Sequence, residues 1–216
     1  MLEYERECWK AGIKRLAGMD EAGRGPLAGP VVAAAVVIDR CFLEAQEHEL
    51  LRDLTDSKQL TESQRESFYA LLIASDSVQF GVGSAGPDEI DSLNILNATH
   101  VAMARALKAL PEMPEHVLVD GLAVRGLPCA STPIVRGDSA SLLIAGASVI
   151  AKVTRDRLMK KLDTRYPGYG FARHKGYGSR MHMLALLELG PSPIHRRTFR
   201  PVREAAVIRA RKEPVE

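Results

Sequence analysis

The chain has 216 residues, of which 46% are hydrophobic and 26% charged, and its formal net charge is +2. This composition is ordinary for a globular protein and excludes a chain that is disordered throughout. The longest apolar runs, residues 31–38 and 142–151, are too short to cross a bilayer. The first ten residues are partly acidic and lack the apolar segment of a secretory signal, so we expect a cytoplasmic protein with no membrane association.

The first elements that we predict are a short amphipathic helix over residues 1–12 and then a β-hairpin. Residues 13–22 and 31–38 are apolar and flank a turn rich in glycine and proline, a pattern typical of two strands joined by a tight turn. Two adjacent acids, Asp20 and Glu21, stand where the first strand meets this turn. They are either ligands in a site or simply acids that face water.

The next part of the chain predicts helices that alternate with one strand. Residues 39–55 turn polar and indicate a short surface helix. Thr61 and Gln64 have the spacing of a capping box, which predicts a helix over 62–74. Residues 77–85 alternate between large apolar and smaller side chains and predict a strand. Proline and two acids at 87–89 then favour the start of a helix that runs to residue 110.

Two further carboxylates stand beside glycine after short predicted strands. Residues 116–119 predict a strand that ends at Asp120, and Ile134 with Val135 predicts a brief strand that leads to Asp138. Residues 139–163 are apolar in their first half and charged in their second, which favours a helix that is buried at its start. This order of elements predicts an α/β fold with a mixed sheet flanked by helices.

After residue 165 the composition changes to glycine, aromatic and basic residues, with a helix predicted from about 179 to 189. We therefore divide the chain into a main domain over 1–165 and a small helical C-terminal element over 166–216, packed against it. The basic residues of this last part favour either a surface for a polyanion or a solvated basic face. Charge alone does not separate the two. The three cysteines form no Cys-x-x-Cys pair and predict neither a disulfide framework nor a zinc site.

Four carboxylates therefore stand out by their positions at the ends of predicted elements. Mg²⁺ and Mn²⁺ bind through carboxylate oxygens, and two such ions about 3.5–4 Å apart promote phosphodiester cleavage. Acids at close range repel one another, so a cluster of them needs a cation. The pattern leaves open whether the four converge. They are Asp20, Glu21, Asp120 and Asp138.

Several motifs together resemble bacterial ribonuclease HII, and they occur in that family's order along nearly the whole chain. The resemblance implies a ribonuclease H-like fold and an endoribonuclease that cleaves the RNA strand of RNA·DNA hybrids. It also implies nicking 5′ to a single ribonucleotide in duplex DNA, which leaves a 5′-phosphate and a 3′-hydroxyl, with Mn²⁺ or Mg²⁺ as cofactor. The motifs are DEAGRGPLAGPV (20–31), DSK (56–58), VDG (119–121), GDS (137–139), ASVIAKVTRD (147–156), YPGYGFARHKGYG (166–178) and HRRTFRPV (195–202).

The resemblance also implies roles for particular residues. The four acids would be the catalytic, metal-coordinating residues, and residues 1–165 would form the catalytic domain, with substrate binding in residues 166–216. The loop of Gly23, Arg24 and Gly25 would meet the 2′-hydroxyl of the ribonucleotide, and glycine permits such a close approach. Tyr177 would lie against the next sugar; the alternative is an aromatic ring packed within its loop.

Lys58 and Lys152 are candidate contacts for the phosphates of the substrate, and the alternative for each is a solvated or structural lysine. The six histidines are most simply core or surface residues, although His174 is close enough to Tyr177 in sequence to touch nucleic acid. Residues 142–148 depart from the family's usual small-residue stretch, which bears on helix packing more than on chemistry.

Two rival functions remain open at this point. One is another metal nuclease on the same superfold, such as a junction resolvase or an integrase-like enzyme, which would act without a ribonucleotide. The other is a non-catalytic module that binds hybrids or phosphate; the turn lacks the Gly-Lys-Ser/Thr ending of a P-loop. For the endoribonuclease we expect nucleic acid as the partner, either an RNA·DNA hybrid or a DNA duplex with an embedded ribonucleotide, and we expect a monomer.

Overall fold

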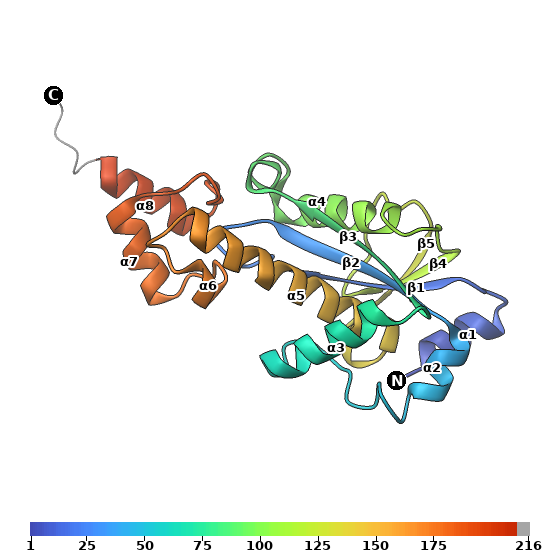
Figure 1. The fold of residues 1–216 in the computed structure, drawn as a ribbon. Helices are drawn as coiled ribbons and strands as arrows, with labels where there is room; N and C mark the ends of the chain where they lie inside the picture. Colours follow the sequence, from blue (N-terminus) through green and yellow to red (C-terminus); the bar gives the residue numbers. More distant parts are fainter. Residues whose placement is uncertain (211–216) are drawn as a thin grey trace.

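The computed structural model describes residues 1–210, and its centre is a five-stranded sheet with the order β3-β2-β1-β4-β5 (Figure 1). Strand β2 is antiparallel to both β1 and β3, whereas β4 is parallel to both β1 and β5. The mixed sheet that the sequence predicts is therefore confirmed. The strands are β1 (Leu16–Ala22), β2 (Val31–Ile38), β3 (Val78–Ala85), β4 (His116–Asp120) and β5 (Ala130–Ile134).

Helices cover both faces of the sheet, as Figure 1 shows, with α4 on one side and the long α5 with α3 on the other. Every residue of β2 is buried, because alternate side chains pack into the two cores on opposite faces. Val36 packs with the α5 side, and Val37 packs with Met103 on the α4 side. The helices are α1 (Glu3–Lys10), α2 (Arg40–Gln46), α3 (Glu62–Ala74), α4 (Pro87–Lys108) and α5 (Leu142–Arg165).

Helix α5 packs directly on β1, and one glycine makes this possible. A Cβ atom built on Gly18 would lie 2.1 Å from the backbone carbon of Leu143, so no larger residue fits at this crossing. The start of α5 is thereby held beside the strand that carries Asp20. This contact positions the loop before α5, which carries Asp138 in the short 3-10 helix η1 (Gly137–Ser139).

The predicted boundaries of most elements are confirmed, and the capping box of Thr61 and Gln64 is present at the start of α3. Two predictions were wrong in detail. The strand predicted at Ile134 and Val135 lies over Ala130–Ile134, and Val135 is 72% exposed. This strand is at the edge of the sheet, where it tolerates polar residues and proline and gives a weak sequence signal.

The helix predicted over 87–110 contains a break at Asn94, where φ is 67°. The Asn94 side chain accepts hydrogen bonds from the N–H groups of Leu96 and Asn97, so it begins the second half of the helix as a cap does. Leu93 and Leu96, on either side of this break, are exposed.

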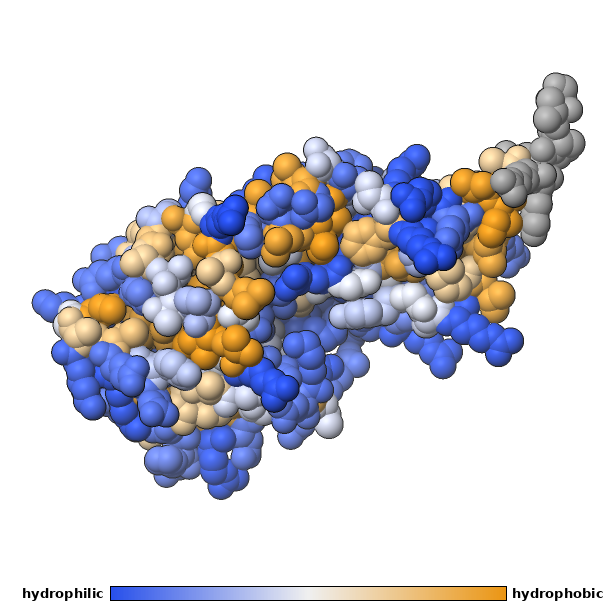
Figure 2. All heavy atoms as spheres, turned by 180° about the vertical axis from the view of Figure 1, so that it is seen from behind, coloured by the Kyte–Doolittle hydropathy of each residue, from blue (hydrophilic) through white to orange (hydrophobic). Residues whose placement is uncertain are grey.

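A group of short helices forms the narrower end of the molecule, at the far end of α5 (Figures 1 and 2). Its helices are α6 (Phe171–His174), α7 (Arg180–Leu189) and α8 (Arg200–Ala210). Figure 2 shows hydrophilic and hydrophobic side chains interspersed over one whole face of the molecule. The helical C-terminal element is confirmed as far as residue 210, and the prediction for 211–216 lies outside the described residues. Within residues 1–210 no helix has the length and hydrophobicity needed to cross a membrane.

Candidate active site

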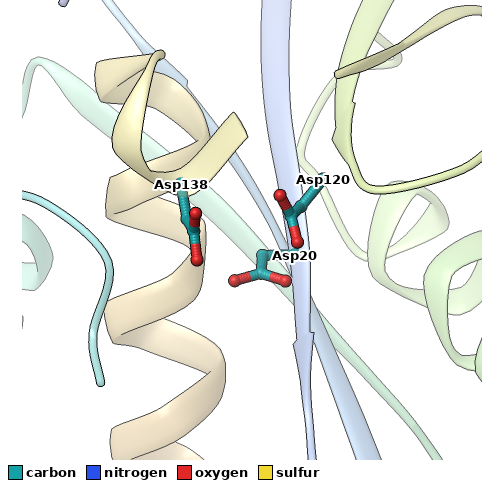
Figure 3. A group of neighbouring side chains, drawn as sticks. All are labelled: Asp20, Asp120 and Asp138. Carbon is teal, nitrogen blue, oxygen red and sulfur yellow. The ribbon is translucent and has the colours of Figure 1, made fainter. Parts of the chain in front are cut away.

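Three aspartates from different elements converge at one edge of the sheet. Asp20 lies on β1, Asp120 ends the parallel strand β4, and Asp138 lies in η1 (Figure 3). Each offers one carboxylate oxygen, and these oxygens all lie within 4.8 Å of one another. The convergence follows from the topology, because β1 and β4 are adjacent and end at the same edge.

Backbone hydrogen bonds hold these carboxylates in place. The N–H group of Gly137 donates to Asp120 Oδ1 at 2.7 Å, which ties the loop that carries Asp138 to the end of β4. The N–H group of Glu21 donates to Asp20 Oδ1 at 2.7 Å. The cluster is therefore held by its backbone before any ligand binds.

The electrostatics of the cluster favour a bound cation. Asp20 and Asp138 are only 3% and 5% exposed. Burial, followed by the charges of Glu21 and Asp120, raises the pKa of Asp20 well above its ordinary value. Burial, together with repulsion from Asp120, raises the pKa of Asp138 to about 6. Buried like charges with only oxygen donors fit a hard divalent ion such as Mg²⁺ or Mn²⁺.

Glu21 lies next to this group of three aspartates without being part of it. Its Oε1 atom is 3.3 Å from Nη1 of Arg24, and burial raises the pKa of the Glu21 carboxyl while Arg24 opposes the shift. Its side chain lines the same cavity as Asp20 and Asp120. The sequence left open whether the four acids converge, and the structure brings three of them within reach of a single ion.

The glycine loop and Tyr177 line a cavity of about 270 Å³ together with Asp20, Glu21 and Asp120. Gly23 has φ +99°, and a Cβ atom on it would lie 2.0 Å from Nε of Arg155, so this position requires glycine. A Cβ atom on Gly25 would lie 3.7 Å from Cε1 of the Tyr177 ring, so the loop and the ring are within contact range. Tyr177 is 48% exposed, unlike an aromatic ring that merely fills a loop.

Both candidate phosphate-binding lysines line the cavity, in different electrostatic settings. Lys58 Nζ is 3.9 Å from Asp138 Oδ2. Burial lowers the pKa of Lys58, but Asp56 and the site aspartates outweigh it and raise the pKa overall. Lys152 Nζ is 2.7 Å from Asp156 Oδ1, and burial lowers the pKa of Lys152. Lys152 is thus held in a short ion pair, so a structural role is better supported for Lys152 than for Lys58.

Comparison with known proteins assigns the family. The model of the ribonuclease HII family matches residues 17–202. The chain belongs to the ribonuclease HII family. It is 52% identical to the ribonuclease HII of Geobacillus kaustophilus, over 94% of this chain and 75% of that protein. The corresponding protein of Geobacter sulfurreducens is also 52% identical, over 94% of this chain and 89% of its own length.

Solved structures agree with membership of the ribonuclease HII family. Ribonuclease H2 from Pyrococcus horikoshii is 30% identical, with a TM-score of 0.74 over 92% of this chain and all of that one. Bst-RNase HIII in complex with Mn²⁺ shares the fold, with a TM-score of 0.64 over 92% of this chain and 71% of that one, at 18% identity. Members of the family are metal-dependent nucleases that cleave the RNA strand of RNA·DNA hybrids, and the chain is an enzyme of this class.

The sequence did not predict the two arginines buried behind the cavity, and it left open whether each histidine lies in the core or on the surface. Arg155 and Arg196 are 1% and 0% exposed, and His182 and His195 are also buried. The motifs RD and HRR contain three of these residues, but arginines usually lie on surfaces, so the pattern gives no sign that Arg155 and Arg196 are buried. The buried Glu5 was also missed; its Oε1 accepts from Ser141 Oγ and the Leu143 N–H, next to the loop of Asp138.

Proposed function

We propose that this chain nicks duplex DNA on the 5′ side of an embedded ribonucleotide, as well as cleaving the RNA strand of hybrids, and leaves a 5′-phosphate and a 3′-hydroxyl. One observation carries this proposal: two members of the convergent carboxylate cluster, Asp20 and Asp120, line the same cavity as the glycine loop. The cluster suits phosphodiester chemistry, and the loop suits recognition of a 2′-hydroxyl. Neither rival function requires both.

The four acids Asp20, Glu21, Asp120 and Asp138 would hold the divalent ions, and Mg²⁺ and Mn²⁺ both suit their oxygen donors. Bound there, such ions supply an activated water and stabilise charge on the leaving oxygen. Asp138 would complete the set of ligands or accept a proton at its carboxylate.

The remaining residues of the cavity would orient the substrate. The backbone of Gly23, Arg24 and Gly25, which lines the cavity, would meet the 2′-hydroxyl, and the absence of a side chain at Gly23 lets the loop lie directly against Arg155. The half-exposed ring of Tyr177 would pack on the neighbouring deoxyribose. Lys58, and more weakly Lys152, would attract the phosphates.

We further propose a division of labour between residues 1–165, which carry the four acids, and the C-terminal element from residue 166, which carries Tyr177. We also propose that the enzyme is a monomer. Light scattering after gel filtration tests this, and a dimer mass at assay concentration would contradict it.

The decisive experiment uses a labelled DNA duplex with one ribonucleotide and an all-DNA duplex of the same sequence. Each is incubated with the protein in Mg²⁺, in Mn²⁺ or in chelator. We expect a metal-dependent nick 5′ to the ribonucleotide and none in the control. No nick with either metal would refute the proposal, whereas cutting of the all-DNA duplex would favour a nuclease of the resolvase type.

A glycine substitution separates ribose selection from general nuclease activity. Gly23→Ala is expected to remove cleavage at the ribonucleotide, because the added methyl group collides with Arg155 and displaces the loop. Gly86→Ala is the matched control, since Gly86 has φ −76° and no atom within 4 Å of a built Cβ. Equal activity of the two variants would remove the loop from substrate selection.

A further inference from the structure

Residues 194–196 lie directly behind the substrate-facing loop and pair with it through the backbone. The Gly29 N–H donates to the Ile194 carbonyl at 2.8 Å, and the Arg196 N–H donates to the Leu27 carbonyl at 2.9 Å. Between these bonds, Ala28 and His195 form an antiparallel bridge. A short part of the C-terminal element is thereby joined to the turn between β1 and β2, far from it in sequence.

The guanidinium of Arg196 binds the loop through three carbonyl groups. Its Nη1 donates to the Arg24 carbonyl at 2.8 Å, its Nη2 to the Gly23 carbonyl at 2.5 Å, and its Nε to the Gly29 carbonyl at 3.0 Å. In the described part of the chain these bonds go to backbone oxygens and none goes to a carboxylate. The rigid fork of arginine therefore defines where two of the three residues of the glycine loop lie.

The burial of this cation indicates a positional role. Arg196 is 0% exposed, and burial, with repulsion from Arg155, lowers its pKa to about 9. A buried charge without a carboxylate partner costs free energy that an apolar residue would not. The gain is a planar donor that matches three carbonyls at once, and no uncharged side chain offers that geometry.

His195 reaches the opposite wall of the cavity through a second buried histidine. The Ser192 N–H donates to His195 Nδ1 at 2.9 Å, so the proton of the His195 ring is on Nε2. This Nε2 lies 3.0 Å from His182 Nε2, which must then accept. The His182 proton is therefore on Nδ1, and it donates to the Tyr177 carbonyl at 2.9 Å. These tautomers are assigned from the hydrogen-bond network.

We propose that the segment Ile194–Arg196 is the positioning element for ribose selection, because it holds the glycine loop through Arg196 and Tyr177 through His195 and His182. Arg196 and His195 are positioning residues, since neither contacts the proposed substrate. One segment thus fixes the relative positions of the glycine loop and Tyr177, which form two walls of the cavity. This inference rests on the proposed function, whose own test is cleavage by the unmodified protein.

The test compares Arg196→Lys with Arg40→Lys, a matched change at an arginine that is exposed, paired with Glu44 and outside the proposed site. Lysine keeps the charge but cannot bind three carbonyls as a fork. We expect Arg196→Lys to lower kcat/KM on the single-ribonucleotide duplex about tenfold to a hundredfold, since small misplacements in a site have effects of this size. Arg40→Lys should behave as the unmodified protein does.

A second readout separates positioning from stability. In the Asp120→Asn background, which should not cleave, affinity is measured for the single-ribonucleotide duplex and for the all-DNA duplex. Arg196→Lys should remove the preference for the ribonucleotide and leave affinity for all-DNA unchanged. A folded variant that keeps the preference and the rate would overturn the inference, while failure of the unmodified protein to cleave would instead refute the proposed function.

If Arg196→Lys melts below the assay temperature, Arg196→Ala is assayed with and without millimolar methylguanidinium, which can occupy the vacated space. Recovery of cleavage and of ribonucleotide preference supports positioning by the guanidinium. No recovery of either would overturn the inference, because the residue would then serve only the stability of the fold.

Discussion

The carboxylate cluster and the buried arginines are two charged regions beside the same cavity. The fold balances their charges in opposite ways. Asp20, Asp120 and Asp138 bring like charges together, and the pKa values of two of them are raised. Arg155 and Arg196 instead donate to backbone carbonyls throughout. In the first region the fold leaves these like charges largely unmatched, which suits a cation, whereas in the second region the chain itself supplies an acceptor for each of these donors. A binding site is recognised here by charge that the fold leaves unmatched.

The largest expected effect concerns the unmatched region. Asp120→Asn should reduce cleavage about a thousandfold or more, equivalent to roughly 4 kcal/mol of barrier, because a metal ligand is lost. Duplex affinity should change little. The measurement is single-turnover cleavage of the single-ribonucleotide duplex, with Asp76→Asn as a control at an exposed acid. A normal rate for Asp120→Asn would exclude Asp120 from the mechanism.

The next largest effect concerns the buried arginines, whose donors bind backbone carbonyls. Arg155→Met should lower the free energy of unfolding by about 3 kcal/mol, because the carbonyls of Ala28, Pro30 and Lys175 lose their donor. Arg157→Met, at a surface ion pair with Glu66, should cost less than about 1 kcal/mol. Denaturant unfolding of both variants measures the difference. Equal losses would mean that burial does not distinguish the two arginines.

We expect acid to lower the free energy of unfolding through the pair of buried histidines, His182 and His195, behind Tyr177. Burial, followed by His182, lowers the pKa of His195 from 6.5 to about 4. As the pH falls, His195 therefore takes up a proton in the unfolded chain before it does so in the folded protein. The contribution of His195 to the free energy of unfolding is thus fully present above pH 6.5 and is lost as the pH falls towards 4. The loss should be on the order of 3 kcal/mol.

Unfolding by denaturant across this pH range, with His195→Gln as comparison, measures the effect. The variant should show a shallower dependence on pH. A dependence as steep as that of the unmodified protein would place the titration elsewhere.

Through the carboxylate cluster, we expect the free energy of unfolding to change with pH in the opposite direction and by a smaller amount. The pKa of Asp138 is raised from 3.8 to about 6, so in chelator the folded state loses stability as pH rises from about 4 to about 6. Asp138→Asn should therefore stabilise the metal-free protein above pH 6 by roughly 1–2 kcal/mol. Thermal unfolding in chelator measures this. Adding Mg²⁺ should shrink the difference, and a destabilised variant would contradict the repulsion argument.

Local signals in the sequence predicted much of the fold. The capping box at Thr61 gave the first residue of α3, and the glycine-rich turn predicted the hairpin that carries Asp20. These features depend on neighbours along the chain, which is why the pattern reveals them. The break at Asn94 did not follow, since an asparagine cap within a helical pattern is indistinguishable from a surface asparagine.

The sequence by itself determined the family, the α/β class and the identity of the candidate acids, because their motifs and strand ends are local in the chain. Only the tertiary structure decided which acids come within 4.8 Å, and that Arg196 and His195 lie inside the protein rather than on a basic surface. The physical reason is that burial and convergence depend on contacts between distant segments. Arg196 meets Gly23 across 173 positions of the chain, and no local pattern records that contact.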